Sequence, residues 1–120
     1  MKGRHLLLLA PLLACNEAIT PPTFDIDGRW AYNVVDAGSV MQVTQQDGAI
    51  TGEGTRFRNE FGTDSFQVQG TYTPPLVILQ FVYTGSQACS YIATLQDPGV
   101  TMVGTMTCGG KPPASINFSR

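Results

Sequence analysis

Apolar and polar residues alternate in short runs along the chain from residue 25 onward, and this stretch shows no helical period. Gly, Pro and Asp interrupt the runs after roughly every ten residues, a spacing typical of an all-β sandwich or barrel. The pattern predicts eight strands, at residues 26–35, 40–46, 49–57, 65–73, 76–84, 88–96, 101–108 and 115–120.

One turn sets the register of the second and third predicted strands. Asp47-Gly48 is typical of a type I′ turn, because both residues accept a positive φ angle with little strain. It pairs Gln46 with Ala49 and places Met41, Val43, Ile50, Gly52 and Gly54 on one face of the hairpin.

A second turn, Asp97-Pro98-Gly99, predicts a four-residue loop closed by Gln96 and Thr101. The register that follows sets Leu95 opposite Met102, Tyr91 opposite Met106 and Cys89 opposite Cys108. Because two cysteines meet in a register chosen from the turn alone, we expect a disulfide between these strands. Such cross-strand cysteines favour the close, non-hydrogen-bonded pairs.

One face of the predicted strands is persistently apolar, and the other is rich in Thr, Gln and Ser. The apolar face also includes Ile26, Trp30, Tyr32, Val34, Phe66, Val68, Gly70, Tyr72, Val77, Leu79, Phe81, Tyr83, Ile116 and Phe118. Short connections favour antiparallel pairing of sequential strands. A meander of eight strands with one solvent-exposed face closes most easily into a barrel. The predicted fold is therefore all-β, a single eight-stranded antiparallel up-and-down meander barrel. A barrel of this size leaves room inside for side chains or for one small ligand.

The beginning of the chain has a different pattern. A short basic stretch (MKGRH) is followed by a brief apolar run that ends at Ala14-Cys15, the plan of a secretion signal. The tetrad Leu12-Leu13-Ala14-Cys15 resembles the lipobox of bacterial lipoproteins. The resemblance implies a signal peptide at 1–14, a lipid on Cys15 that holds the protein to a membrane, and cleavage before Cys15. The alternative is an ordinary cleaved signal with an incidental cysteine.

Residues 15–24 are predicted to be the lipidated N-terminus and a flexible tether, because Pro21-Pro22 lies there without a periodic pattern. The barrel domain is then 25–120. Asn16 follows the cysteine, where an aspartate would resemble an inner-membrane retention signal. We therefore expect a lipid-anchored protein of the bacterial cell envelope, with the outer membrane favoured, on its periplasmic or surface face.

Composition excludes several function classes for the domain. Five basic and nine acidic residues follow Cys15, a net charge of −4 without a basic stripe, so nucleic acid is not an expected partner. The single histidine, His5, lies in the signal, which removes imidazole chemistry and histidine metal ligands. The carboxylate pairs at 25/27 and 60/64 are typical solvated turn residues. We expect no enzyme activity, no catalytic residue, no metal and no cofactor.

Gly28-x-Trp30 in the first predicted strand resembles the Gly-x-Trp signature of the calycins, the lipocalin and avidin group. The Gly-rich segments 46–52 and 68–72 are similar to hairpins of small avidin-like envelope lipoproteins. The resemblance implies a barrel in which a basic residue of the last strand packs across the tryptophan at the closed end. Arg120, on the inward side of the last predicted strand, is the residue expected to do so.

Two functions remain open. In the first, the barrel binds an apolar or amphiphilic small ligand inside or at its mouth, and inward glycines at 52, 54, 70 and 104 make room for it. The candidate ligand-binding residues are Trp30, Tyr32, Gln45, Arg56, Tyr72, Phe81, Tyr83 and Tyr91. The same glycines are compatible with a filled core.

In the second, the protein is a surface interaction module, or a protease-inhibitor-like one, with a solid core and no small ligand. Its candidate contact is the segment 56–63, predicted to be the longest connection, which carries Arg56, Phe57, Arg58 and Phe61. Arginine and aromatic side chains are enriched at protein interfaces. A cavity would favour the first function, and a closed interior with an exposed Phe57 or Phe61 the second.

Overall fold

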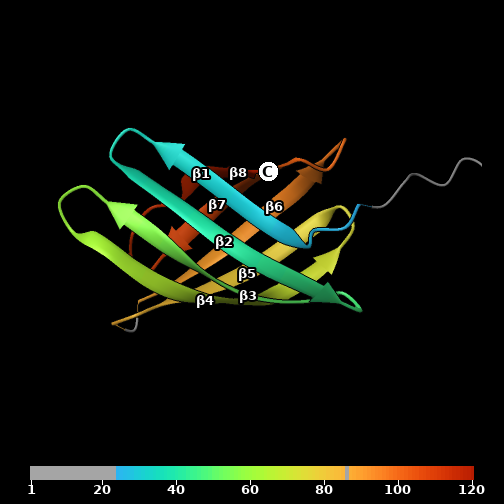
Figure 1. Ribbon diagram of the computed structural model, residues 1–120, viewed down its shortest axis with the longest axis horizontal. Helices are drawn as coiled ribbons and strands as arrows, with labels where there is room; N and C mark the ends of the chain where they lie inside the picture. Colours follow the sequence, from blue (N-terminus) through green and yellow to red (C-terminus); the bar gives the residue numbers. More distant parts are fainter. Residues whose placement is uncertain (1–23, 86) are drawn as a thin grey trace, which may run out of the picture.

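The computed structural model describes residues 24–85 and 87–120, and these form a closed barrel of sequential antiparallel strands (Figure 1). The predicted signal peptide (1–14), the lipid on Cys15 and nearly all of the tether lie outside the described residues. The strands are β1 (Gly28–Val34), β2 (Ala37–Gln46), β3 (Ala49–Arg58), β4 (Gly62–Thr73), β5 (Leu76–Tyr83), β6 (Ala88–Gln96), β7 (Thr101–Cys108) and β8 (Ala114–Ser119). The predicted fold class is confirmed.

The structure confirms both registers predicted from turns. Gln46 pairs with Ala49 across an Asp47-Gly48 turn in which both residues have positive φ angles, 52° and 82°. At the second turn, Gln96 pairs with Thr101 across a four-residue loop. Leu95 faces Met102, Tyr91 faces Met106 and Cys89 faces Cys108. The two cysteines form the expected disulfide, and their Cα atoms lie 4.2 Å apart, close to the spacing of a non-hydrogen-bonded pair.

Predictions at one end of the barrel need correction. β2 begins at Ala37, because Val34 and Ala37 pair across a two-residue turn where a longer loop was expected. Val34 is consequently 61% exposed instead of inward. Most of the segment 56–63 is strand. β3 continues to Arg58, β4 begins at Gly62, and a three-residue turn joins them. The longest connection is instead 109–113, between β7 and β8.

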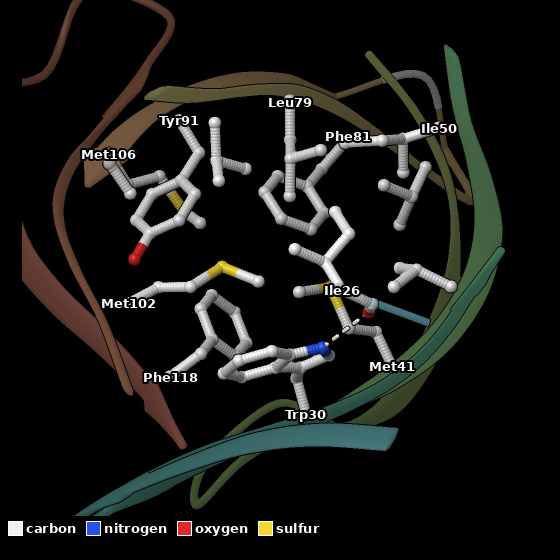
Figure 2. Close-up of a cluster of buried hydrophobic side chains, with 14 of the residues drawn as sticks. Ile26, Trp30, Met41, Ile50, Leu79, Phe81, Tyr91, Met102, Met106 and Phe118 are labelled. Carbon is white, nitrogen blue, oxygen red and sulfur yellow. Dashed lines mark hydrogen bonds between the residues drawn. The ribbon is translucent and has the colours of Figure 1, made fainter. Parts of the chain in front are cut away.

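The interior is filled by side chains from every strand. Figure 2 shows part of this cluster in a view into the barrel. Edge-to-face ring contacts connect Tyr32 with Phe118 at 5.2 Å, Tyr91 with Phe118 at 5.4 Å and Phe66 with Phe81 at 5.2 Å. The fully buried large side chains are Trp30, Tyr91, Phe66, Phe81, Phe118, Ile26, Met41, Ile50, Leu79, Met102, Val43 and Val77. The core therefore has the dense packing that stabilises folded proteins.

The inward glycines do not leave space beside them. A Cβ atom at Gly54 would lie 2.5 Å from the Phe66 ring and 2.3 Å from the carbonyl oxygen of Val40. At Gly70 and Gly104 a Cβ atom would collide with the backbone of the neighbouring strand, at 1.9 and 2.5 Å. These glycines allow the strands and rings to approach one another, which matches the filled-core interpretation.

The outer face is less polar than predicted on one side of the barrel. Ile78 of β5 and Ile92 of β6 face each other on the outside, 41% and 57% exposed. Leu76, Val82 and Val103 are also exposed there. A shallow groove of about 640 Å³ runs beside this isoleucine pair, over Gly70.

Candidate functional site: the open end of the barrel

The two ends of the barrel are built differently, and we name them the closed end and the open end. The closed end has the β2–β3, β4–β5 and β6–β7 turns together with the entering chain at residues 24–27 (right in Figure 1). The open end has the β1–β2, β3–β4, β5–β6 and β7–β8 connections (left in Figure 1). The disulfide lies toward the open end, where β6 begins and β7 ends.

Arg120 seals the closed end. Its guanidinium lies 4.4 Å from the centre of the Trp30 ring and donates to the backbone oxygens of Gly99 at 2.9 Å, Asp27 at 2.8 Å and Asp25. The Trp30 indole N–H in turn donates to the Ile26 oxygen at 2.9 Å (Figure 2). The packing of Arg120 across Trp30 that the calycin resemblance implied is confirmed. β1 meets β8 through one register pair, Ala31 with Ser119, so these bonds also brace the seam that closes the barrel.

The predicted ligand-binding residues divide into three groups in the structure. Trp30, Phe81 and Tyr91 are fully buried in the core, and the Tyr91 hydroxyl donates to the Ile116 oxygen at 2.8 Å. Gln45 and Tyr72 lie toward the closed end, where the Tyr72 hydroxyl donates to the Phe24 oxygen at 2.8 Å. Tyr32, Arg56 and Tyr83 come together at the open end.

These last three residues line a pocket of about 210 Å³ that we call the mouth pocket. Arg56 also belongs to the predicted partner loop, and two more residues of that loop, Phe57 and Arg58, line the pocket, so the two predicted sites meet here. The remaining lining residues are Ala37, Met106, Cys108, Lys111, Pro112, Ala114 and Ile116.

Arg56 occupies the centre of the open end and has partners on three sides. It forms a bidentate pair with Asp64, at 2.8 and 3.1 Å, and donates to the Gln87 side chain at 2.9 Å. Its guanidinium lies 3.5 Å from the centre of the Tyr83 ring. The hydrogen bonds from Arg56 hold the pKa of Asp64 below its ordinary value. This network fixes Arg56 in position and joins β3, β4 and the β5–β6 connection.

The phenols of Tyr32 and Tyr83 both contribute to the polar part of the mouth pocket. Burial raises the pKa of each phenol, and the positive charge of Arg56 opposes the shift in both. Arg58 also opposes the shift at Tyr32. Both phenols are therefore protonated at neutral pH and able to donate a hydrogen bond.

Arg58 and Lys111 are less constrained than Arg56. Arg58 approaches Asp64 only to 3.9 Å, and its Nε atom is buried without a hydrogen-bond partner among the described residues. Its guanidinium lies 4.9 Å from the centre of the Phe61 ring. Lys111 is exposed on the β7–β8 connection. Three of the five basic residues in the barrel domain thus line one pocket, which has no acidic lining residue.

The β3–β4 hairpin end, residues 56–63, exposes two phenylalanines beside this pocket. Phe57 is 49% exposed and Phe61 is 73% exposed. Phe61 lies in the turn, and Asn59 of the same turn donates its backbone N–H to the Asp36 oxygen at 2.9 Å. The hairpin end is therefore held against the β1–β2 turn while it presents aromatic surface outward.

Sequence reasoning missed the contribution of β7, β8 and the connection between them. Met106, Ile116 and Lys111 line the mouth pocket although their strands are distant in sequence from 56–63. A usable signal was present: the predicted disulfide places Cys108 at the same end as these residues. Closure of the barrel then brings this end of β7 and β8 around to the arginines of β3.

The described part of the chain contains neither a cluster of metal ligands nor a candidate membrane-spanning helix. Within residues 24–85 and 87–120, no group of three or more acidic, cysteine or histidine side chains could hold a metal ion. Over the same ranges the chain has no helix with the length and apolarity that a membrane span requires.

The class defined by the structure is the closed, eight-stranded, up-and-down antiparallel barrel with a filled core. Comparisons of the chain with models of protein families, with curated proteins and with solved structures found no match.

Proposed function

We propose that this protein is a lipid-anchored module of the bacterial cell envelope that binds a protein partner through the open end of its barrel. The observation that carries the proposal is a filled interior combined with exposed aromatic residues at one end. The core side chains leave the barrel solid, while Phe57 and Phe61 stand exposed beside the mouth pocket. Aromatic residues, phenylalanine included, and arginine are enriched at protein interfaces.

The position of the entering chain supports an orientation for this module. The described part begins at Phe24, whose backbone oxygen is bonded to Tyr72 at the closed end. A lipid on Cys15 would tether this end to the membrane, and the nine residues 16–24 span at most about 30 Å when extended. The open end then faces away from the membrane, where a partner approaches it freely.

A photo-crosslinking experiment in the native envelope tests this function. A benzophenone-bearing phenylalanine analogue replaces Phe61 in the full-length lipidated protein, and a matched variant carries it at Thr71, exposed on β4 toward the closed end. We expect one discrete adduct from position 61, none from position 71, and loss of the adduct after Arg58→Glu. Equal labelling from both positions, or no adduct from position 61, contradicts the proposal.

A second candidate function is the binding of a small amphiphile at the mouth pocket. The combination of an apolar floor, with Met106 and Ile116, and basic side chains at the rim favours it. The volume of about 210 Å³ argues against it as the main function, because sites for small molecules usually measure about 300–1,000 Å³. The pocket is large enough for one side chain of a partner.

A further inference from the structure

We propose that the mouth pocket is a carboxylate-binding site, which receives an acidic side chain of the protein partner together with an adjacent apolar one. The inference rests on the proposed function and names the chemistry of the partner segment. The pocket is lined by Arg56, Arg58 and Lys111, while the domain as a whole carries a net charge of −4. A local concentration of positive charge on an acidic protein is selective for negative groups.

The donors differ in how fully they are already bonded. Arg56 is paired with Asp64 and Gln87, so the carboxylate offsets its charge and Arg56 supplies a fixed position more than charge or free N–H groups. Arg58 has a buried Nε without a partner among the described residues, and a buried donor of this kind normally has an acceptor. Lys111 and the Tyr32 phenol add two further donors from other sides of the pocket.

The floor of the pocket determines what accompanies the carboxylate. Met106, Ala114, Ile116 and the half-buried Cys108 provide apolar surface beneath the three cations. A free inorganic anion leaves this surface exposed to water. An apolar group attached to the acid covers the surface, and its burial contributes roughly 25 cal/mol of binding free energy per Å². An acidic residue next to leucine or another aliphatic residue matches both parts of the pocket. The exposed rings of Phe57 and Phe61 extend the apolar contact beyond it.

The methionines provide a direct probe of this site. Three methionines follow Cys15: Met106 lines the mouth pocket, while Met41 and Met102 are fully buried in the core. Residues 16–120, labelled with ¹³C at the methionine methyl groups, are titrated with the blocked peptide acetyl-Gly-Leu-Glu-Gly-amide. The glutamine peptide acetyl-Gly-Leu-Gln-Gly-amide is the matched probe.

We expect the glutamate peptide to shift the Met106 signal saturably, while the Met41 and Met102 signals stay unchanged. The glutamine peptide should bind about tenfold more weakly, since it lacks the charge that the cations bind. Arg58→Gln and Lys111→Gln should each weaken binding at least threefold. Arg29→Gln, which removes the same charge from an exposed position on β1, should leave it unchanged.

Three results would overturn the inference: equal affinity for the two peptides, no movement of Met106 at 10 mM peptide, or an equal effect of Arg29→Gln and Lys111→Gln. Octanoate is titrated in parallel to identify the source of the carboxylate. Octanoate that binds more tightly than the glutamate peptide overturns the assignment to a protein partner. Because crosslinking at position 61 tests the partner and not the carboxylate, failure here is distinguishable from failure of the proposed function.

Discussion

The closed and open ends of the barrel each contain an arginine stacked on an aromatic ring, yet the two arginines serve different purposes. At the closed end, Arg120 lies over Trp30 and donates only to backbone oxygens of its own chain. At the open end, Arg56 lies over Tyr83 and bonds to side chains, and Arg58 beside it keeps a donor that no described residue accepts from. Arg120 is thus fully engaged by its own chain, whereas the open end retains positive charge and a donor for another molecule; among the described residues the closed end keeps one unpaired acceptor, Gln45 Oε1.

Removal of one aromatic side chain at each end should give the largest difference in stability between the two ends. Trp30→Ala empties a fully buried site and should lower the free energy of unfolding by about 3–5 kcal/mol. Tyr32→Ala, two residues along β1 at the half-buried open end, should cost about half as much or less, because solvent reaches the site. Urea unfolding followed by circular dichroism measures both. Equal losses would remove the energetic distinction between the ends.

The disulfide is the main covalent support of the open end. Replacing Cys89 and Cys108 together by serine should cost about 3 kcal/mol, because the crosslink spans 19 residues and restricts the unfolded chain. The melting temperature of the oxidised protein, with and without reductant, checks this value. An unchanged melting temperature on full reduction would show that the strand ladder alone holds this end.

Matched arginine substitutions compare the two ends directly. Arg120→Gln removes the contact with Trp30 and three bonds to backbone oxygens, and should cost about 2 kcal/mol. Arg58→Gln should cost less than about 0.5 kcal/mol, since its ion pair with Asp64 is long at 3.9 Å. Chemical unfolding of both variants measures the two losses in free energy of unfolding. A larger loss from Arg58→Gln would mean that the open end is also completed by its own contacts.

Acid should act on the open end through Asp64. The pKa of this carboxyl is lower in the folded protein than its ordinary value of 3.8, because Arg56 bonds to it. Its stabilising effect is therefore present above the unfolded pKa and is lost as the pH falls through the folded pKa. Below about pH 4 the wild type should lose stability more steeply than Asp64→Asn, and the two unfolding curves should converge. Parallel curves from pH 6 to pH 2 would contradict this role.

The smallest effect on stability is expected at Phe61. Because its ring is 73% exposed, Phe61→Ala should change the free energy of unfolding by less than about 0.5 kcal/mol. The same variant should abolish or strongly reduce the adduct formed by a crosslinker at Phe57, the neighbouring exposed ring. A large loss of stability together with normal crosslinking would reverse the assignment and make Phe61 a folding residue.

The strand order and two registers were predictable because they depend on local signals. Asp47-Gly48 fixes one hairpin by its φ angles, and Asp97-Pro98-Gly99 fixes another that places Cys89 opposite Cys108. The filled core was not predictable from the sequence. The alternation of apolar and polar residues shows which side chains face inward, but not how closely they pack, for example whether the Phe66 ring covers Gly54.

The sequence predicted only part of the candidate site, because the other part depends on contacts between residues distant in sequence. Arg56 and Phe57 are close in sequence to the other residues of their hairpin, so their grouping was visible. Lys111 and Ile116 join them only through closure of the barrel, a long-range event. The ends of β3 and β4 were misjudged because Gly62, with φ of 77°, allows a tighter turn than composition suggested.

Native mass spectrometry tests whether the barrel is solid and carries no ligand. Residues 16–120, exported without the lipidated cysteine and purified gently from the envelope, are weighed before and after organic extraction. We expect the mass of the bare chain in both spectra, because buried side chains fill the interior formed by residues 24–85 and 87–120. A reproducible excess mass that extraction removes would contradict this expectation and identify the protein as a ligand carrier.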